Sequence, residues 1–169
     1  MTAIKMNIHA ITLDPQSNSP ILILKEEGGD RTLPIWIGLL EATAIATEME
    51  KLEFARPMTH DLAVNLLKAA GIRLVRIDVT ELKDNTYYAE ITLDTGDKLV
   101  RVDSRPSDAV ALALRADADI FVNEAVLESA TKVEAPQPSV MTGDEKEKDE
   151  DKWNKILEDL DPNAFKYKM

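Results

Sequence analysis

The chain has 169 residues, a formal net charge of −11, no cysteine and only two histidines, His9 and His60. This length fits one domain with a tail, the lack of cysteine excludes disulfides and thiolate metal sites, and two histidines make a histidine-based zinc site improbable. The acidic balance argues against a general nucleic-acid binder, because phosphate backbones are bound mainly through Lys and Arg. With no apolar run near the ~18 residues of a membrane span and no signal-peptide layout, we expect a cytoplasmic protein without membrane contact.

The first half of the chain predicts three strands followed by two helices. We expect strands at 4–13, 20–27 and 31–38, and helices at 39–53 and 60–70. The strands are indicated by short apolar and alternating stretches, and the Gly-Gly-Asp turn at 28–30 predicts a hairpin between the second and third. Pro34 lacks a backbone donor, so the third strand is expected at a sheet edge or at a bulge. Thr59 is expected to cap the second helix.

The second half predicts the same three-strand unit and helix, then one more strand and helix. We expect strands at 72–82, 87–93 and 98–103, a helix at 106–116, a strand at 119–123 and a helix at 124–131. With a shift of 67 positions, 29–46 aligns with 96–113, and five of the 18 aligned residues are identical. We interpret this as a duplicated strand–strand–strand–helix unit, with chance similarity as the alternative. The predicted fold is α+β: a mixed, mostly antiparallel sheet with helices packed on it.

The composition changes after residue 132. We expect residues 1–132 to form the folded domain and 133–150, with its prolines and charges, to be an acidic disordered linker. Residues 151–169 are expected to hold a short amphipathic helix and a tail. The apolar residues at helical spacing are Trp153, Ile156, Leu157 and Leu160. Residues 151–160 therefore predict a docking helix for the chain's own body, a sister subunit or a protein partner.

Polar residues are concentrated just before the third predicted helix. Pro106 suits the first helical position, which makes Arg105 the N-cap and places Asp108 where a carboxylate favours the helix dipole. This structural account leaves Asp103 and Arg105 unexplained. The functional alternatives are an anion site at the helix start, or an oxygen-ligand site for Mg²⁺ or Mn²⁺ that combines Asp103 and Asp108 with the distant Glu41.

A second polar cluster lies at 56–62, with the sequence RPMTHDL. Thr59 as a cap and Asp61 in the first turn are enough for a structural account. A lone exposed histidine is more often without a catalytic role, but His60 has Arg56 and Asp61 close by in sequence. Histidine can act as a general base on water, and arginine can bind a phosphate through two hydrogen bonds.

Three segments together carry a family resemblance: LPIWIGLLEATAIA, RPMTHDL and DSRPSDAVALALR, in this order and spacing. They resemble the bifunctional nuclease family, whose name refers to activity on both DNA and RNA. The resemblance covers about residues 5–131 and implies a compact α+β domain, a homodimer or larger homo-oligomer, and phosphodiester hydrolysis with DNA and RNA as substrates. The matching polar positions are Glu41, Arg56, His60, Asp61, Asp103, Arg105, Ser107 and Asp108.

We infer roles for these positions from what phosphodiester cleavage requires: an activated water, neutralised phosphate oxygens and a stabilised leaving oxygen. The expected ligands of Mg²⁺ or Mn²⁺ are Glu41, Asp103 and Asp108, and the ion would activate a water and neutralise phosphate oxygens. His60, oriented by Asp61, would deprotonate that water. The expected phosphate-binding residues are Arg56, Arg105 and Ser107.

The alternative is a module without catalytic activity, which uses the same charged cleft to bind an anionic metabolite or a protein partner. Convergence of the acidic residues and His60 in one pocket would favour the enzyme. Carboxylates that cap separate helices on opposite sides would favour the module.

Overall fold

The computed structural model describes residues 2–132. Seven strands and four helices lie in this part of the chain, in the order β1 (Ala3–Leu13), β2 (Pro20–Glu26), β3 (Thr32–Trp36), α1 (Leu39–Met49), α2 (Thr59–Ala69), β4 (Arg73–Lys83), β5 (Thr86–Asp94), β6 (Leu99–Ser104), α3 (Pro106–Ala116), β7 (Asp119–Asn123) and α4 (Glu124–Lys132). The order of elements expected from the sequence is confirmed. The predicted linker at 133–150 and the predicted helix at 151–160 lie outside the described residues.

The strands form one sheet in the order β3-β2-β1-β7-β4-β5-β6. Strand β7 lies in the middle, antiparallel to β1 and parallel to β4, and the other neighbours are antiparallel. The expectation of a mixed, mostly antiparallel sheet is therefore confirmed. Pro34 lies in β3, an edge strand of this sheet, as its missing backbone donor predicts.

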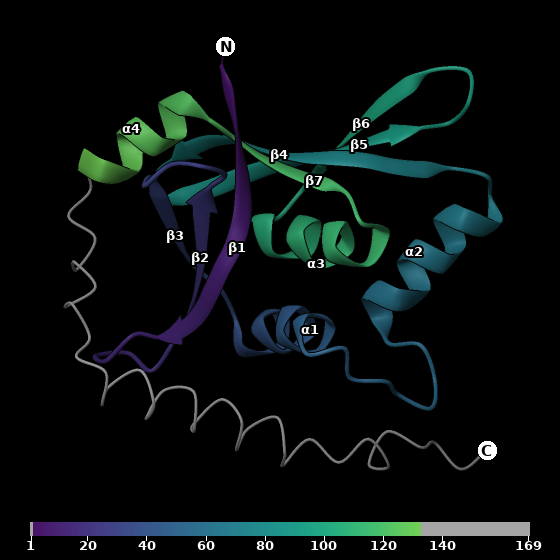
Figure 1. Cartoon of the computed structure of the whole chain (residues 1–169), viewed down its shortest axis with the longest axis horizontal. Coiled ribbons are helices and arrows are strands. Elements are labelled where there is room, and N and C mark those ends of the chain that lie inside the picture. Colours follow the sequence, from purple (N-terminus) through teal and green to yellow (C-terminus); the bar gives the residue numbers. More distant parts are fainter. Residues whose placement is uncertain (1, 133–169) are drawn as a thin grey trace.

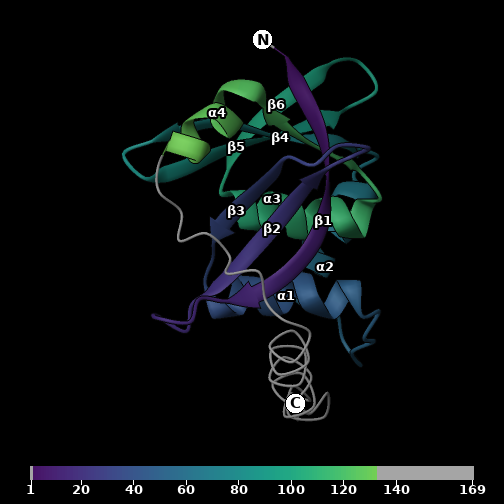
Figure 2. The same cartoon turned by 60° about the vertical axis from the view of Figure 1, so that its left-hand side comes forward.

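The sheet curls around helix α3. Figure 1 shows β1 to β3 running nearly vertically and β4 to β7 nearly horizontally, with α3 and α1 in the angle between them. Figure 2 shows α3 above α1, with strands β1 to β3 crossing in front of the two helices. The Tyr87 hydroxyl on β5 donates a hydrogen bond to the Pro34 carbonyl on β3 at 3.3 Å, which joins the two halves of the curled sheet. Helix α2 packs on α3, and α4 contacts β3, β4 and β7.

The two halves have the same architecture, as the internal repeat predicts. In each half, three consecutive strands form an antiparallel meander that a helix follows. The shift of 67 positions places the bounds of α1 on those of α3 without an offset. Glu41 and Asp108 therefore hold the same position, in the first turn of the helix of each half.

The core lies between the curled sheet and the helices. Large side chains without exposed surface come from β2, β4 and α3, including Leu22, Ile77 and Val110. Helix α3 is buried along much of its length, and the small residues Ala109 and Ala113 are also fully buried. Because close-packed interiors leave few voids, this core fixes α3 firmly against the strands.

Two helix boundaries differ from the prediction. Helix α1 ends at Met49 rather than at residue 53, because Lys51 adopts a left-handed conformation (φ 52°) and the backbone N–H of Leu52 bonds back to the helix. The N-cap of α2 is Met58, not Thr59. Its backbone N–H donates to Asp61 Oδ2 at 2.8 Å, so the acidic residue in the first turn fixes this helix start.

Candidate functional site

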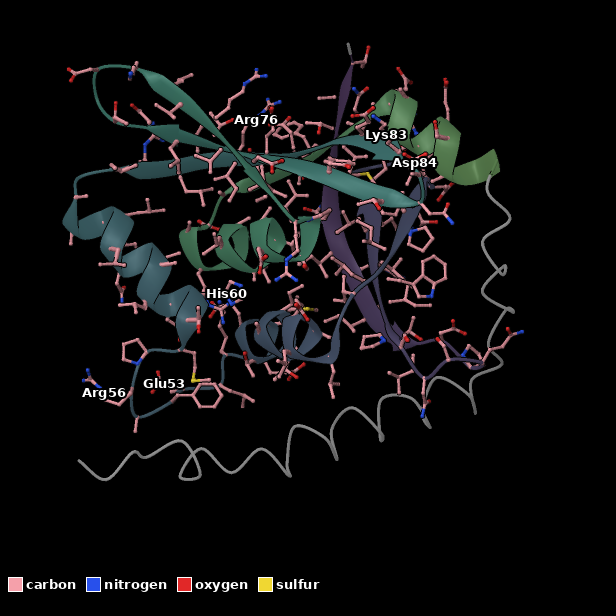
Figure 3. The ribbon with its side chains drawn as sticks, turned by 180° about the vertical axis from the view of Figure 1, so that it is seen from behind. Glu53, Arg56, His60, Arg76, Lys83 and Asp84 are labelled. Atoms are coloured by element: carbon pink, nitrogen blue, oxygen red, sulfur yellow. The ribbon has the colours of Figure 1, made fainter. Side chains whose placement is uncertain are left out.

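The first turns of three helices meet at one place in the structure. They contribute Glu41 from α1, His60 from α2 and Asp108 from α3, and Arg105 immediately precedes α3. Figure 3 shows His60 at the start of α2, on the side that faces α1 and α3. Helix N-termini carry partial positive charge, so the two carboxylates suit these positions.

A continuous set of hydrogen bonds joins these four residues, which we call the Arg105 network. His60 Nε2 lies 3.0 Å from Asp108 Oδ1. Arg105 donates from Nε to Asp108 Oδ2 at 2.7 Å and from Nη1 to Glu41 Oε1 at 2.8 Å. Arg105 thus bridges the two carboxylates that occupy equivalent positions in the two halves.

The charge state of Asp108 fixes the tautomer of His60. Burial acts to raise the pKa of the Asp108 carboxyl, but the hydrogen bonds from Arg105 and His60 outweigh it and hold that pKa below its usual value. An ionised carboxylate only accepts hydrogen bonds, so we assign the shared proton to His60 Nε2. In the neutral imidazole Nδ1 is then an acceptor, and it has no hydrogen-bond partner within residues 2–132.

The site is partly accessible to water. The side chain of Arg105 is 65% exposed, while those of Glu41, His60 and Asp108 are 20%, 19% and 30% exposed. The two acids and the histidine are therefore half-buried, and the guanidinium group is the most exposed part of the network. Its hydrogen bond to Asp108, supported by Glu41, raises the pKa of Arg105, so it stays charged.

A second ion pair, between Arg115 on α3 and Asp61 on α2, connects these two helices beside the network. Arg115, near the end of α3, donates from Nε to Asp61 Oδ1 at 2.5 Å and from Nη1 to the Ala111 carbonyl at 2.9 Å. Its side chain is only 7% exposed. Asp61 therefore connects the start of α2 to α3 and forms no hydrogen bond with His60, which differs from its expected role.

Sequence reasoning missed Arg115. The residue was a basic side chain in the last turn of a predicted helix, and such residues usually interact with the helix end. The nearby signal was the first-turn acid Asp61, which was expected to orient His60, but its pairing with Arg115 depends on how α2 packs against α3.

Asp103 does not join the network. Residues directly opposite in an antiparallel pair share a face, and Val102 lies opposite Ile91, a core residue that is 6% exposed. Because successive side chains alternate, Asp103 points to the sheet face away from the helices, opposite Glu90.

Two expected phosphate-binding residues lie apart from the network as well. Arg56 is exposed in the loop before α2, and Figure 3 shows its side chain pointing outward. Ser107 lies in the first turn of α3 but is only 6% exposed. Of the three expected phosphate-binding residues, Arg105 alone belongs to the network.

The carboxylates present do not fit the expected Mg²⁺ or Mn²⁺ site. Glu41 and Asp108 are both engaged by Arg105, whose positive charge occupies the place between them. Asp103, the third expected ligand, lies on the opposite sheet face. Across the described part of the chain, no group of three His, Cys, Asp or Glu side chains is arranged to hold a metal ion.

The arginines are largely neutralised. Outside the network, Arg31, Arg73, Arg76 and Arg101 each pair with a carboxylate, and Arg115 pairs with Asp61. Within residues 2–132, Arg56 is the arginine without an ion pair. No broad basic surface follows from these positions, so any anion would be bound locally.

None of the helices within residues 2–132 has the length and hydropathy needed to cross a membrane.

Comparisons with known proteins match most of the chain. Residues 22–135 match the family model described as the bifunctional nuclease domain. An uncharacterized protein of Mycobacterium tuberculosis is 37% identical over 163 residues, which is 96% of this chain and 98% of that protein.

Two plant relatives have names that state an activity. Bifunctional nuclease 2 of Arabidopsis thaliana is 30% identical over 110 residues, 63% of this chain and 33% of the plant protein. Bifunctional nuclease 1 of Oryza sativa subsp. japonica is 27% identical over 132 residues, 75% of this chain and 39% of the plant protein. The chain thus spans well under half the length of these named nucleases.

Proposed function

Because the chain belongs to the bifunctional nuclease domain family, we propose that it hydrolyses phosphodiester bonds in DNA and RNA with little sequence specificity. The observation that carries this proposal is the contact of His60 Nε2 with Asp108 Oδ1 at 3.0 Å, next to an exposed arginine. The three side chains provide a base, a group that orients the base and a cation for the phosphate.

His60 is the proposed general base. With its Nε2 proton held by Asp108, Nδ1 accepts the proton of an attacking water. The water oxygen bonds to phosphorus as the bond from phosphorus to the leaving nucleotide oxygen breaks, and the leaving oxygen takes a proton from solvent. The imidazolium that forms is then stabilised by the ionised Asp108 carboxylate, whose pKa is lowered although burial acts to raise it. Asp108 thus acts on the base as the aspartate of a hydrolytic triad does, without itself taking the proton.

Arg105 is the proposed phosphate-binding residue. Its Nε and Nη1 donate to Asp108 and Glu41, but Nη2 makes no hydrogen bond within residues 2–132 and the side chain is 65% exposed. A guanidinium held in this way is pre-oriented to donate to a non-bridging phosphate oxygen and to stabilise charge in the transition state. Arg56, exposed in the loop before α2, is the second proposed phosphate-binding residue.

No step of this mechanism uses a metal ion, because the carboxylates do not fit one. Charge neutralisation at the phosphate is assigned to Arg105. Sequence-independent binding follows from contacts to phosphates alone, and the acidic balance of the chain predicts weak binding.

The test is cleavage of labelled single- and double-stranded DNA and RNA by the purified full chain, with Mg²⁺, with Mn²⁺ and with chelator. We expect His60→Gln and Asp108→Asn to lower the cleavage rate by ~10²- to 10⁴-fold, the usual contribution of a general base. His9→Gln is the matched control, since His9 is exposed on β1 and should cleave like wild type. Chelator is expected to leave the rate unchanged.

Equal cleavage by wild type, His60→Gln and Asp108→Asn would refute the assigned site. Activity that disappears in chelator would show that the carboxylates rearrange around an ion and that the metal-free mechanism is wrong. If no substrate is cleaved but labelled oligonucleotides still bind through Arg105, the chain is a binding module, the alternative raised by its sequence.

A further inference from the structure

The Glu41 carboxylate is bound to one end of the Arg105 guanidinium. Arg105 donates from Nη1 to Glu41 Oε1 at 2.8 Å, while its Nε donates to Asp108 Oδ2 at 2.7 Å. An arginine binds a phosphate most strongly through two parallel N–H groups, and Nη2 is the nitrogen that makes no hydrogen bond within residues 2–132. Glu41 therefore competes with any anion that approaches this arginine.

The place of Glu41 depends on the glycine that precedes α1. Gly38 has φ −74° and ψ 162°, an extended conformation that other residues adopt freely. Its backbone therefore does not require glycine. A Cβ at Gly38 would lie 2.2 Å from Glu41 Oε2 and 3.1 Å from Glu41 Cδ. The carboxylate thus fills the space that a side chain at Gly38 would take.

The Arg105 network has more negative than positive charge, although its most exposed group is a cation. Arg105 contributes one positive charge, the carboxylates of Glu41 and Asp108 contribute one negative charge each, and neutral His60 contributes none. The partial positive charges of the helix starts offset part of this excess. A phosphate at Arg105 therefore meets one attractive charge and two repulsive charges.

The outcome depends on the charge of the phosphate. A phosphodiester carries one negative charge, whereas a terminal phosphomonoester carries nearly two at neutral pH. In water, contact of the second charge with a cation at ~4 Å favours binding by about sixfold, and each carboxylate at ~6 Å disfavours it by about threefold. Two carboxylates outweigh the arginine, but one does not.

We propose that Glu41 is a specificity-determining residue, whose carboxylate makes the site prefer phosphodiesters within a strand over terminal phosphomonoesters, and that Gly38 leaves room for it. This role rests on the proposed binding of phosphate by Arg105. Asp108 repels the second charge as well, but it also holds His60. The Glu41 side chain makes its hydrogen bond within residues 2–132 to Arg105, so its charge acts on the phosphate-binding group directly.

The test measures binding rather than cleavage, with dimethyl phosphate as the diester probe and methyl phosphate as the monoester probe. Each is titrated into the ¹⁵N-labelled full chain at constant ionic strength, and the Arg105 Nε–H and His60 ring signals are followed by NMR. Wild type is expected to bind the diester about twofold more tightly. Glu41→Gln keeps an oxygen that accepts from Arg105 but loses the charge, and it should bind the monoester about twofold more tightly.

Two further variants separate the position of the carboxylate from its charge. Gly38→Ala keeps every charge but displaces Glu41 Oε2, so its preference should move in the same direction as that of Glu41→Gln. Glu81→Gln is the matched control, because it removes the same charge from an exposed residue on β4, and it should keep the wild-type preference. The spectra themselves verify that each variant is folded.

A Glu41→Gln chain with the wild-type preference overturns the proposal, as does an equal change in Glu81→Gln or a wild type that prefers methyl phosphate. Failure of both wild type and Glu41→Gln to bind either probe overturns it as well. If the chain cleaves nucleic acid but the preference does not change, the proposed hydrolysis stands and the role of Glu41 is wrong. If the preference changes and no substrate is cleaved, the role of Glu41 stands and the proposed hydrolysis is wrong.

Discussion

Replacing Arg115 with methionine tests how the start of α2 is held against α3. The Arg115 side chain is 7% exposed and bonds Asp61 at 2.5 Å, whereas Asp61 is 31% exposed. Breaking a buried ion pair costs ~3–5 kcal/mol, and partial exposure of the remaining acid reduces this. We therefore expect Arg115→Met to lower the free energy of unfolding by about 2–3 kcal/mol.

The loss should depend on pH. Burial acts to raise the pKa of the Asp61 carboxyl, but the bonds from Arg115 and the Met58 N–H outweigh it and the pKa is lowered. A lowered folded-state pKa gives stability that is complete above the unfolded value of ~3.9 and is lost as pH falls through the folded value. The difference between wild type and Arg115→Met should therefore shrink in acid.

The assay is urea unfolding followed by circular dichroism, at neutral pH and at steps into the acid range. Arg73→Met serves as the control, because the Arg73–Asp94 pair has a similar distance of 2.9 Å but an arginine that is 72% exposed. Surface pairs of this kind contribute ~0–1 kcal/mol. An Arg115→Met chain as stable as Arg73→Met, or a difference that does not change with pH, would refute the reasoning.

Two further substitutions test the packing and the turn that position the site. Gly71→Ala should lower the free energy of unfolding by about 1–2 kcal/mol, because Gly71 has a φ of +70° that other residues rarely adopt. A Cβ at this position meets nothing within 4 Å, so the cost comes from the backbone conformation alone. Ala70→Gly, one residue earlier, is the control, and unchanged stability of Gly71→Ala in urea would contradict the strain argument. Ala109→Leu should cost about 1–3 kcal/mol through overpacking of the α3 core, because Ala109 has no exposed surface. The exposed Ala125→Leu should change the melting temperature little, and an equal effect of both would contradict the packing account.

The order of elements was predictable because each depends on local patterns. The β4–β5 hairpin is an example: Asp84 and Asn85 both adopt positive φ, as their residue types favour in a two-residue turn. The N-cap position of Arg105 followed equally from Pro106. Such features need no knowledge of distant contacts.

The site was predictable only in part. The sequence indicated that Glu41, His60, Arg105 and Asp108 carry chemistry, but not that Arg105 would bridge the two carboxylates. That contact depends on how α1 and α3 pack within the curled sheet. Asp103 is close to Asp108 in sequence and yet lies on the other sheet face, because the register of β5 with β6 decides its direction.

The role of Arg115 was also not predictable from local sequence patterns. Its partner Asp61 lies 54 positions earlier in the sequence, on a helix that propensity alone does not orient. A pairing of this kind follows from tertiary packing, which a single sequence does not specify through local rules.

The bridge that Arg105 makes between Glu41 and Asp108 can form only after both halves of the domain have been synthesised. The counterpart of Arg105 in the first half is Gly38, which has no side chain. The first half therefore supplies only the acid Glu41 to the bridge, whereas the second half supplies both Asp108 and the cation Arg105. Neither half can substitute for the other, and a nascent chain that ends before β6 has no bridge at all. The acquisition of a working site would therefore report that both halves have folded and docked.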